Sequence, residues 1–268
     1  MKHMTNTIAF PGLGLSFEIN RVAFTVFGKE IYWYALILLS GFLLGLLFVY
    51  NTCEKRGISK DHVFDISFWG LIIGIICARI YYVIFDWESL EGNIWNIFKI
   101  WNGGIAIYGS LIGAVGTAYV YSKIKKIKPL KVFDVFVPGL LIGQFVGRWG
   151  NFVNAEVYGG ITTLPWRMTI NGGPGVHPLF IYESLWNFLG FILVCLFRDR
   201  KKTDGQVFFF YTLWYGVGRL FLEGMRQPQY ILWLIPNVFG ISQLVALIAI
   251  LVSVGMLIQL SSKKEPRM

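Results

Sequence analysis

Charged residues are scarce in this chain. Asp, Glu, Lys and Arg together make up 15% of its 268 residues, whereas a soluble domain usually carries about 25%. Hydrophobic residues make up 55% of the chain, and the mean hydropathy is +0.58. These proportions exclude an ordinary soluble protein and indicate one that is embedded in a lipid bilayer.

Cysteine and histidine are also scarce, with three of each, and they are scattered: Cys53, Cys77, Cys195, His3, His62 and His177. An odd cysteine count without a C-x-x-C pair argues against a disulfide framework. The scatter also predicts no metal site. The net charge of +9 lies in separate loops rather than in one soluble patch, so we expect no nucleic-acid partner. We also expect no cofactor.

Seven apolar runs are long enough to cross a membrane as helices, which takes about 20 mostly apolar residues. They lie near residues 32–51, 65–85, 103–122, 132–147, 178–197, 206–223 and 238–260. The runs are too long and continuous for the strands of a barrel. The sequence therefore predicts an all-α membrane protein, a bundle of seven transmembrane helices within a catalytic membrane domain of residues 32–260.

The basic residues predict the orientation of these spans. They cluster after the first, third and fifth runs and in a basic tail, 261–268, whereas the loop after the second run is mainly acidic. The positive-inside rule then places the N-terminus outside and the C-terminus in the cytoplasm. Residues 1–31 do not resemble a signal peptide, because Pro11 and Gly12 interrupt any apolar core. We expect them to be retained as an interfacial segment.

One long external segment, 148–177, lies between the fourth and fifth spans. It begins with GRWGNFVNAEVYGG (Gly147–Gly160), which gathers an arginine, two asparagines and a glutamate between Arg148 and Glu156. Pro165, Pro174 and an NGGPG turn follow, so the segment is predicted to be rich in loops.

Several charged side chains fall in the outer half of the predicted bundle: Arg79, Arg148, Arg219, Arg226, Glu156, Glu183 and Glu223. Charges inside a bilayer are costly unless they are paired or wetted. Four cations against three anions leave room for an anionic ligand, and guanidinium forks suit phosphate. The alternative is a set of ion pairs that hold helices together, as the i, i+4 spacing of Arg219 and Glu223 suggests.

Two further stretches allow structural and functional interpretations. In WNGGIAIYGSLIG (Trp101–Gly113), Gly109 and Gly113 fit close packing of two helices, while the hydroxyl of Tyr108 lies within the outer half of the membrane and needs a partner. In EIYWYAL (Glu30–Leu36), the aromatic residues fit a membrane-interface belt.

A small-anion transporter would also place arginines in a cavity, but it predicts polar residues along the whole path. The inner halves hold few, such as Asp65 and Asp134 near the ends.

The stretch Gly147–Gly159 closely resembles the signature of bacterial prolipoprotein diacylglyceryl transferases. Other blocks of that family occur in the same order along the chain. ARIYYVIF and G-G-x-x-x-Y-G lie before this stretch, and H-P-x-x-x-Y-E and R-x-x-x-E-x-x-R-x-P lie after it. The resemblance implies a multi-pass enzyme of the bacterial cytoplasmic membrane, with its active site towards the outer leaflet. Such enzymes transfer the diacylglyceryl group of phosphatidylglycerol to the lipobox cysteine thiol of a prolipoprotein signal peptide, which forms a thioether and releases glycerol phosphate.

The resemblance also implies roles for single residues. The catalytic residues would be Arg148, Arg219 and Tyr108. Substrate binding would fall to Arg148, Asn151, Asn154, Glu156, Gly159, Tyr32, Glu223 and Arg226, with support from Arg79, Gly104, His177, Tyr182 and Glu183. Many members carry a histidine, proposed as general base, where this chain has Tyr108. A phenol with a pKa of about 10 takes a proton poorly from a thiol of about 8.5, so arginines that stabilise the thiolate are the alternative.

Overall fold

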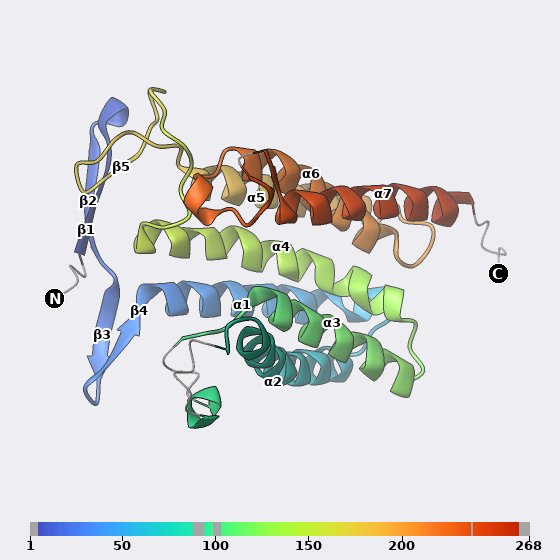
Figure 1. The fold of residues 1–268 in the computed structure, drawn as a ribbon. Helices are drawn as coiled ribbons and strands as arrows, with labels where there is room; N and C mark the ends of the chain where they lie inside the picture. The colour runs from blue at the N-terminus through green and yellow to red at the C-terminus, as the bar shows by residue number, and fades with distance from the viewer. Residues whose placement is uncertain (1–4, 88–93, 99–102, 237, 263–268) are drawn as a thin grey trace. The chain divides into compact units, whose positions relative to one another are not determined.

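Helices dominate the computed structural model, which describes residues 5–87, 94–98, 103–236 and 238–262 (Figure 1). The described residues form seven α-helices: α1 Trp33–Thr52, α2 Lys60–Phe85, α3 Ile107–Ile124, α4 Pro129–Asn154, α5 Leu179–Phe197, α6 Gln206–Gly224 and α7 Ile241–Ser262. Each helix overlaps one of the predicted runs, so the mainly helical membrane class is confirmed. Most of the predicted basic tail, 263–268, and much of the acidic loop lie outside the described residues.

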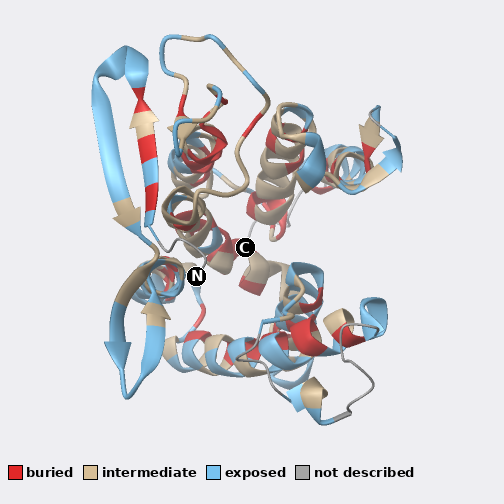
Figure 2. Cartoon of the chain, turned by 60° about the vertical axis from the view of Figure 1, so that its left-hand side comes forward, coloured by how far each residue is buried: buried red, intermediate tan, exposed pale blue. Residues whose placement is uncertain are grey.

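Five of these helices, α1, α2, α4, α5 and α7, have both the length and the hydropathy needed to cross a membrane. Their apolar side chains do not all find partners within the chain. In α7 the mean hydropathy reaches 2.5, yet only 11% of the most apolar window is buried. The helices accordingly carry long exposed stretches (Figure 2), as expected when lipid rather than protein covers them.

The chain divides into two compact units, residues 49–135 and residues 1–48 with 136–268. In the first unit, α2 and α3 approach each other through glycines. A Cβ on Gly109 would lie 2.7 Å from the Cα of Ala78, and one on Gly113 would lie 2.9 Å from the Cα of Gly74. These distances are too short for any side chain, so the helix-packing interpretation of Gly109 and Gly113 is confirmed.

In the second unit, glycines also bring α1 and α4 together. A Cβ on Gly45 would lie 3.3 Å from the Cα of Gly139, and one on Gly150 would lie 2.8 Å from the ring of Tyr34. Helix α4 continues to Asn154, although the prediction ended the span at residue 147 and began a loop at Arg148. Glycine is a poor helix former, but here packing against α1 requires it.

Helices α5 and α6 are joined by two tryptophans. The rings of Trp186 and Trp214 stack at 4.2 Å, and each indole N–H donates to the backbone carbonyl of the other residue, at 3.1 and 3.0 Å. Gly218 and Gly190 leave the space that these rings occupy. The α5–α6 contact therefore fixes the helices that carry Glu183 and Arg219.

Short strands were not predicted, and they correct the purely helical fold class and the description of residues 148–177 as loops. They are β1 Thr5–Phe10, β2 Leu15–Asn20, β3 Val22–Val26, β4 Lys29–Tyr32, β5 Thr169–Ile170, β6 Trp233–Ile235 and β7 Phe239–Gly240. One sheet has the order β2-β1-β5, with Ile8 opposite Ile170. Alternate residues of β1, Ile8 and Phe10, are buried against Met168, Val176 and Phe180. The N-terminal segment is thus tied to the segment 148–177, which was predicted to be external.

Short 3-10 turns complete the described chain: η1 Pro11–Leu13, η2 Glu54–Arg56, η4 Ile94–Phe98 and η6 Pro228–Tyr230. The last of these follows the end of α6, where Arg226 lies. That region is tied to the segment 148–177 by an isolated bridge between Gly159 and Arg226.

Candidate active site

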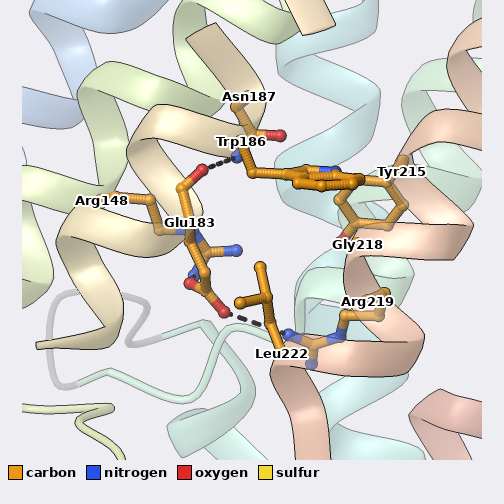
Figure 3. A pocket seen from close by; sticks show the side chains of 8 residues that line it. All are labelled: Arg148, Glu183, Trp186, Asn187, Tyr215, Gly218, Arg219 and Leu222. Carbon is orange, nitrogen blue, oxygen red and sulfur yellow. Dashed lines mark hydrogen bonds and ion pairs between the residues drawn. The ribbon is translucent and has the colours of Figure 1, made fainter. Parts of the chain in front are cut away.

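Glu183, in the first turns of α5, is the centre of a cluster of arginines. Its side chain is 5% exposed. Arg148 Nη1 lies 2.7 Å from Oε2, Arg226 Nη2 lies 3.0 Å from Oε1, and Arg219 Nη1 lies 3.8 Å from Oε1. Figure 3 shows Arg148 and Arg219 approaching the carboxylate from different helices. Glu183, which was predicted only to support the site, therefore brings together α4, α6 and the turn that follows α6.

Glu223 is the second buried anion of this cluster, with 1% of its surface exposed. It lies 3.1 Å from Arg219 Nη2, which confirms the predicted i, i+4 pair, and 3.4 Å from Arg226 Nε. The described chain offers neither Glu223 Oε2 nor Arg226 Nε a hydrogen-bond partner of good geometry. Burial and the neighbouring Arg219 lower the pKa of Arg226, while Glu183 and Glu223 raise it. Three guanidinium groups face two carboxylates, so the cluster keeps one excess positive charge.

A small cavity adjoins the cluster. It is lined by Arg148, Glu183, Trp186, Asn187, Tyr215, Gly218, Arg219 and Leu222 (Figure 3). Its volume of about 20 Å³ is enough for roughly one water molecule. Arg148 and Arg219 keep 22% and 19% of their side-chain surface exposed, against 9% for Arg226. The first two are therefore placed to meet a ligand, while Arg226 lies deeper and braces both carboxylates.

The cavity also presents an unused hydrogen-bond acceptor. Asn187 donates from Nδ2 to the backbone carbonyl of Glu183 at 2.8 Å. Its Oδ1 is buried and has no partner among the described residues. Because buried polar groups are normally hydrogen-bonded, this oxygen suits a hydroxyl donor in the cavity. Sequence reasoning missed Asn187, although its position one turn after Glu183 was a usable signal.

The remaining polar residues of the signature close around Glu156. Its Oε1 accepts hydrogen bonds from Asn151 Nδ2 at 3.1 Å and from Asn154 Nδ2 at 3.3 Å. The flanking residues Ala155 and Val157 have φ values of 52° and 56°. Such values are uncommon for residues other than glycine and especially for a β-branched one, so the loop carries strain of the kind that functional sites retain.

Tyr34 is a second residue that sequence reasoning left in the aromatic belt. Its ring packs on Gly150 of the signature, two residues after Arg148. Tyr32, the predicted substrate contact, instead donates to Glu30 Oε2 at 2.7 Å and is 42% exposed. That hydrogen bond raises the pKa of Tyr32. The substrate role of Tyr32 stays a prediction.

Gly159 joins the signature to the end of α6. Its N–H donates to the carbonyl of His177 at 2.9 Å, and a Cβ would lie 2.6 Å from His177 Cβ and 2.8 Å from the oxygen of Met225. This close approach explains why position 159 requires a glycine, and the explanation needs no bound ligand. The predicted supporting residues His177 and Tyr182 lie 3.4 Å apart, Nδ1 to hydroxyl, and Tyr182 also accepts from Trp166 Nε1 at 2.7 Å.

The other predicted site residues belong to the unit 49–135. Arg79 is 8% exposed and donates to the backbone carbonyls of Ile97, Gly103, Gly104 and Asn96. Gly104 has a φ of 76°, and a Cβ there would overlap Arg79. Arg79 thus holds a loop through backbone carbonyls, which differs from the ion pairs between helices that the structural alternative proposed. Tyr108, near the start of α3, is 42% exposed, and its ring centroid lies 6.2 Å from that of Tyr81.

Comparisons with known proteins agree with the signature. A family model described as Prolipoprotein diacylglyceryl transferase matches residues 21–259. Relatives named phosphatidylglycerol–prolipoprotein diacylglyceryl transferase occur in Clostridioides difficile (41% identical; 92% of this chain and 98% of the relative) and in Finegoldia magna (44%; 92% and 97%). One from Listeria innocua is 42% identical and is covered to 92% in both chains. The chain therefore belongs to the prolipoprotein diacylglyceryl transferase family.

Proposed function

We propose that this protein transfers the diacylglyceryl group of phosphatidylglycerol to the cysteine thiol of a prolipoprotein signal peptide, the first step of lipoprotein maturation. Family membership supports this reaction. The observation that carries the proposal is the convergence of three arginines on Glu183 and Glu223, with one positive charge in excess and two guanidinium groups at a cavity. A phosphodiester is an anion that such a cluster suits.

The chemistry needs charge stabilisation on one side of a carbon atom and a nucleophile on the other. The thiol loses its proton, its sulfur forms a bond to the glyceryl carbon, and the bond from that carbon to the phosphate oxygen breaks. Glycerol phosphate leaves with an additional negative charge. Arginines held in a site of low dielectric stabilise this charge without reorganising, and we assign that role to Arg148 and Arg219.

The size of the cavity implies an exchange of partners. About 20 Å³ does not hold a phosphate, and the Glu183 carboxylate already occupies the centre of the cluster. On binding, the phosphate oxygens would take over part of the coordination of Arg148 and Arg219, while Arg226, which also contacts Glu223, keeps Glu183 in place. Asn151, Asn154 and Glu156 would orient the glycerol head group, with Asn187 Oδ1 available to a hydroxyl.

Activation of the thiol has two candidate routes. Tyr108 would act as the base, or the arginines would lower the pKa of the substrate cysteine so that thiolate forms directly. We keep Tyr108 as the predicted catalytic residue. The substitution Tyr108→Phe separates the two routes because it removes only the hydroxyl.

For the membrane we propose seven crossings, an external N-terminus and a cytoplasmic C-terminus, in the bacterial cytoplasmic membrane. Five helices meet the length and hydropathy of a span, and the basic loops supply the orientation. With this topology the arginine cluster lies towards the outer leaflet, where the signal peptide of an exported precursor arrives. Labelling of single cysteines placed in each loop, with a membrane-impermeant reagent on intact cells, tests this arrangement.

The decisive experiment combines the purified protein, phosphatidylglycerol and a lipobox peptide. The expected result is a mass increase on the peptide cysteine together with release of glycerol phosphate. Arg148→Ala and Arg219→Ala should abolish both while the protein still accumulates in the membrane, and lysine should substitute poorly because it lacks the fork. Arg200→Ala, in the exposed turn after α5, is the matched control and should be active. Full activity of either cluster variant would refute the proposed clamp.

A further inference from the structure

The turn between β3 and β4 has an unusual sequence for its shape. Val26 and Lys29 are paired, and the two residues between them, Phe27 and Gly28, have φ values of 49° and 77°. Two-residue hairpin turns with both φ values positive favour Asn-Gly or Asp-Gly, and a bulky residue there is an outlier. The side chain of Phe27 is also fully exposed. Neither the turn geometry nor packing within the chain accounts for a phenylalanine at this position.

The hairpin has one apolar face and one polar face. Residues that are directly opposite in an antiparallel pair lie on the same side of the sheet. Phe24 pairs with Ile31, and Val26 pairs with Lys29, so these four share one face. Thr25 and Glu30 pair on the other face. Phe24 and Val26 are 50% and 42% exposed, which leaves the apolar face open along the hairpin and at its tip.

The position of the hairpin indicates what covers this face. Strand β4 ends at Tyr32 and α1 begins at Trp33, so no linker separates the hairpin from a candidate membrane span (Figure 1). The N–H of Trp33 donates to the carbonyl of Arg21 at 3.0 Å, which ties the other end of the hairpin to the start of the helix. Trp33 is 46% exposed, as expected for an aromatic residue at the lipid–water boundary.

We propose that the apolar face and tip of this hairpin, Phe24, Val26 and Phe27, insert into the lipid interface of the bilayer that α1 enters. Lys29, on the same face, meets the phosphate groups of anionic lipids, and Thr25 and Glu30 face water. The anchor holds the start of α1 at a fixed depth. That helix carries Tyr34, which packs on Gly150 beside Arg148. The inference depends on the membrane class of the protein and not on the transferase reaction.

Photochemical crosslinking in the full-length protein tests the lipid contact. Phe27 is replaced by the photoreactive analogue p-benzoylphenylalanine, and the protein is reconstituted in vesicles of phosphatidylglycerol and phosphatidylcholine or kept in native membranes. Intact mass after irradiation should show phospholipid adducts in several-fold excess over the same probe at Thr25, on the polar face. Equal adduct yields at the two positions, or adducts to another protein in native membranes, would overturn the proposal.

A second variant separates anchoring from folding. Phe27→Asn removes the ring but supplies a residue that the turn favours. With the photoprobe at Phe24 in this background, the yield of lipid adduct should fall several-fold while the unfolding temperature stays equal or rises. A lower unfolding temperature with an unchanged adduct yield would show that the ring serves the fold, and the anchor would be rejected.

Discussion

Glu183→Gln is the most informative single change, because Glu183 contacts three arginines. The substitution keeps the shape of the side chain and one carbonyl acceptor but removes the charge. Breaking a buried ion pair by removal of one partner costs about 3–5 kcal/mol. Here Arg148 and Arg219 keep 22% and 19% of their side-chain surface exposed, so we expect the low end, about 3 kcal/mol. For a chain of this size that corresponds to a fall of about 6–12 °C in the unfolding temperature.

The same substitution changes the response of the protein to anions. With Glu183 neutral, three guanidinium groups face only Glu223, and the local excess charge rises from one to two. An anion that binds the folded state stabilises it by an amount that grows logarithmically as its dissociation constant falls below its concentration. Glycerol phosphate, the proposed leaving group, should therefore raise the unfolding temperature of Glu183→Gln more than that of the unmodified protein.

Thermal unfolding of the purified protein in detergent measures both effects, with glycerol and with sodium chloride of matched ionic strength as controls. Glu54→Gln is the matched variant, because Glu54 pairs with Lys60 at 3.6 Å while 63% of its side chain is exposed. Exposed pairs contribute about 0–1 kcal/mol, so this variant should unfold near the normal temperature. If glycerol phosphate stabilises Glu183→Gln no more than the unmodified protein, the idea that Glu183 holds the place of a phosphate is wrong.

Three further predictions concern single contacts. Gly109→Ala should lower the free energy of unfolding by about 1–3 kcal/mol, because its methyl group would overlap the backbone of α2 and separate α2 from α3. The control is Gly116→Ala, where an added Cβ would meet nothing within 4 Å. In the same thermal assay this control should be neutral or stabilising. Gly159→Ala should loosen the junction with His177 and Met225 and reduce both the unfolding temperature and turnover, so normal values of both would contradict the close approach. Tyr108→Phe should lower the turnover number about 10²–10⁴-fold if the phenol takes the thiol proton, whereas near-normal turnover would assign activation of the thiol to the arginines.

Part of the candidate site could be predicted from spacing alone. Arg219 and Glu223 lie one helical turn apart, and the structure pairs them at 3.1 Å. The roles of Glu183 and Asn187 could not be predicted in the same way. Glu183 meets partners that come from other helices and from a turn. Nothing in the local sequence H-P-x-x-x-Y-E distinguishes a glutamate that contacts three arginines from one that forms a single ion pair. The role of Arg79, whose donors are taken by backbone carbonyls of a loop, matched neither the predicted ligand site nor the predicted ion pairs between helices.

The ends of the helices and the positions of the strands were also only partly predictable from the sequence. Hydropathy predicted the seven helices, but it ended the fourth at residue 147, because glycines and polar residues follow. The helix continues to Asn154, and the glycine at position 150 leaves the space that the ring of Tyr34 occupies. The strands of the N-terminal segment were missed, although β1 pairs with its neighbour β2 and β3 pairs with its neighbour β4. The pairing of β1 with β5, more than 150 residues further along the chain, could not be predicted from neighbouring residues.

The sequence by itself determined the membrane class, the seven helical runs and the family, because hydropathy and signature spacing are sums over neighbouring residues. Tertiary structure alone decided which arginine meets which carboxylate, and how much of each guanidinium group is left for a ligand. Those contacts join α4, α5, α6 and the turn after α6. They depend on how closely glycines and stacked tryptophans let the helices approach, which no local pattern in the chain records.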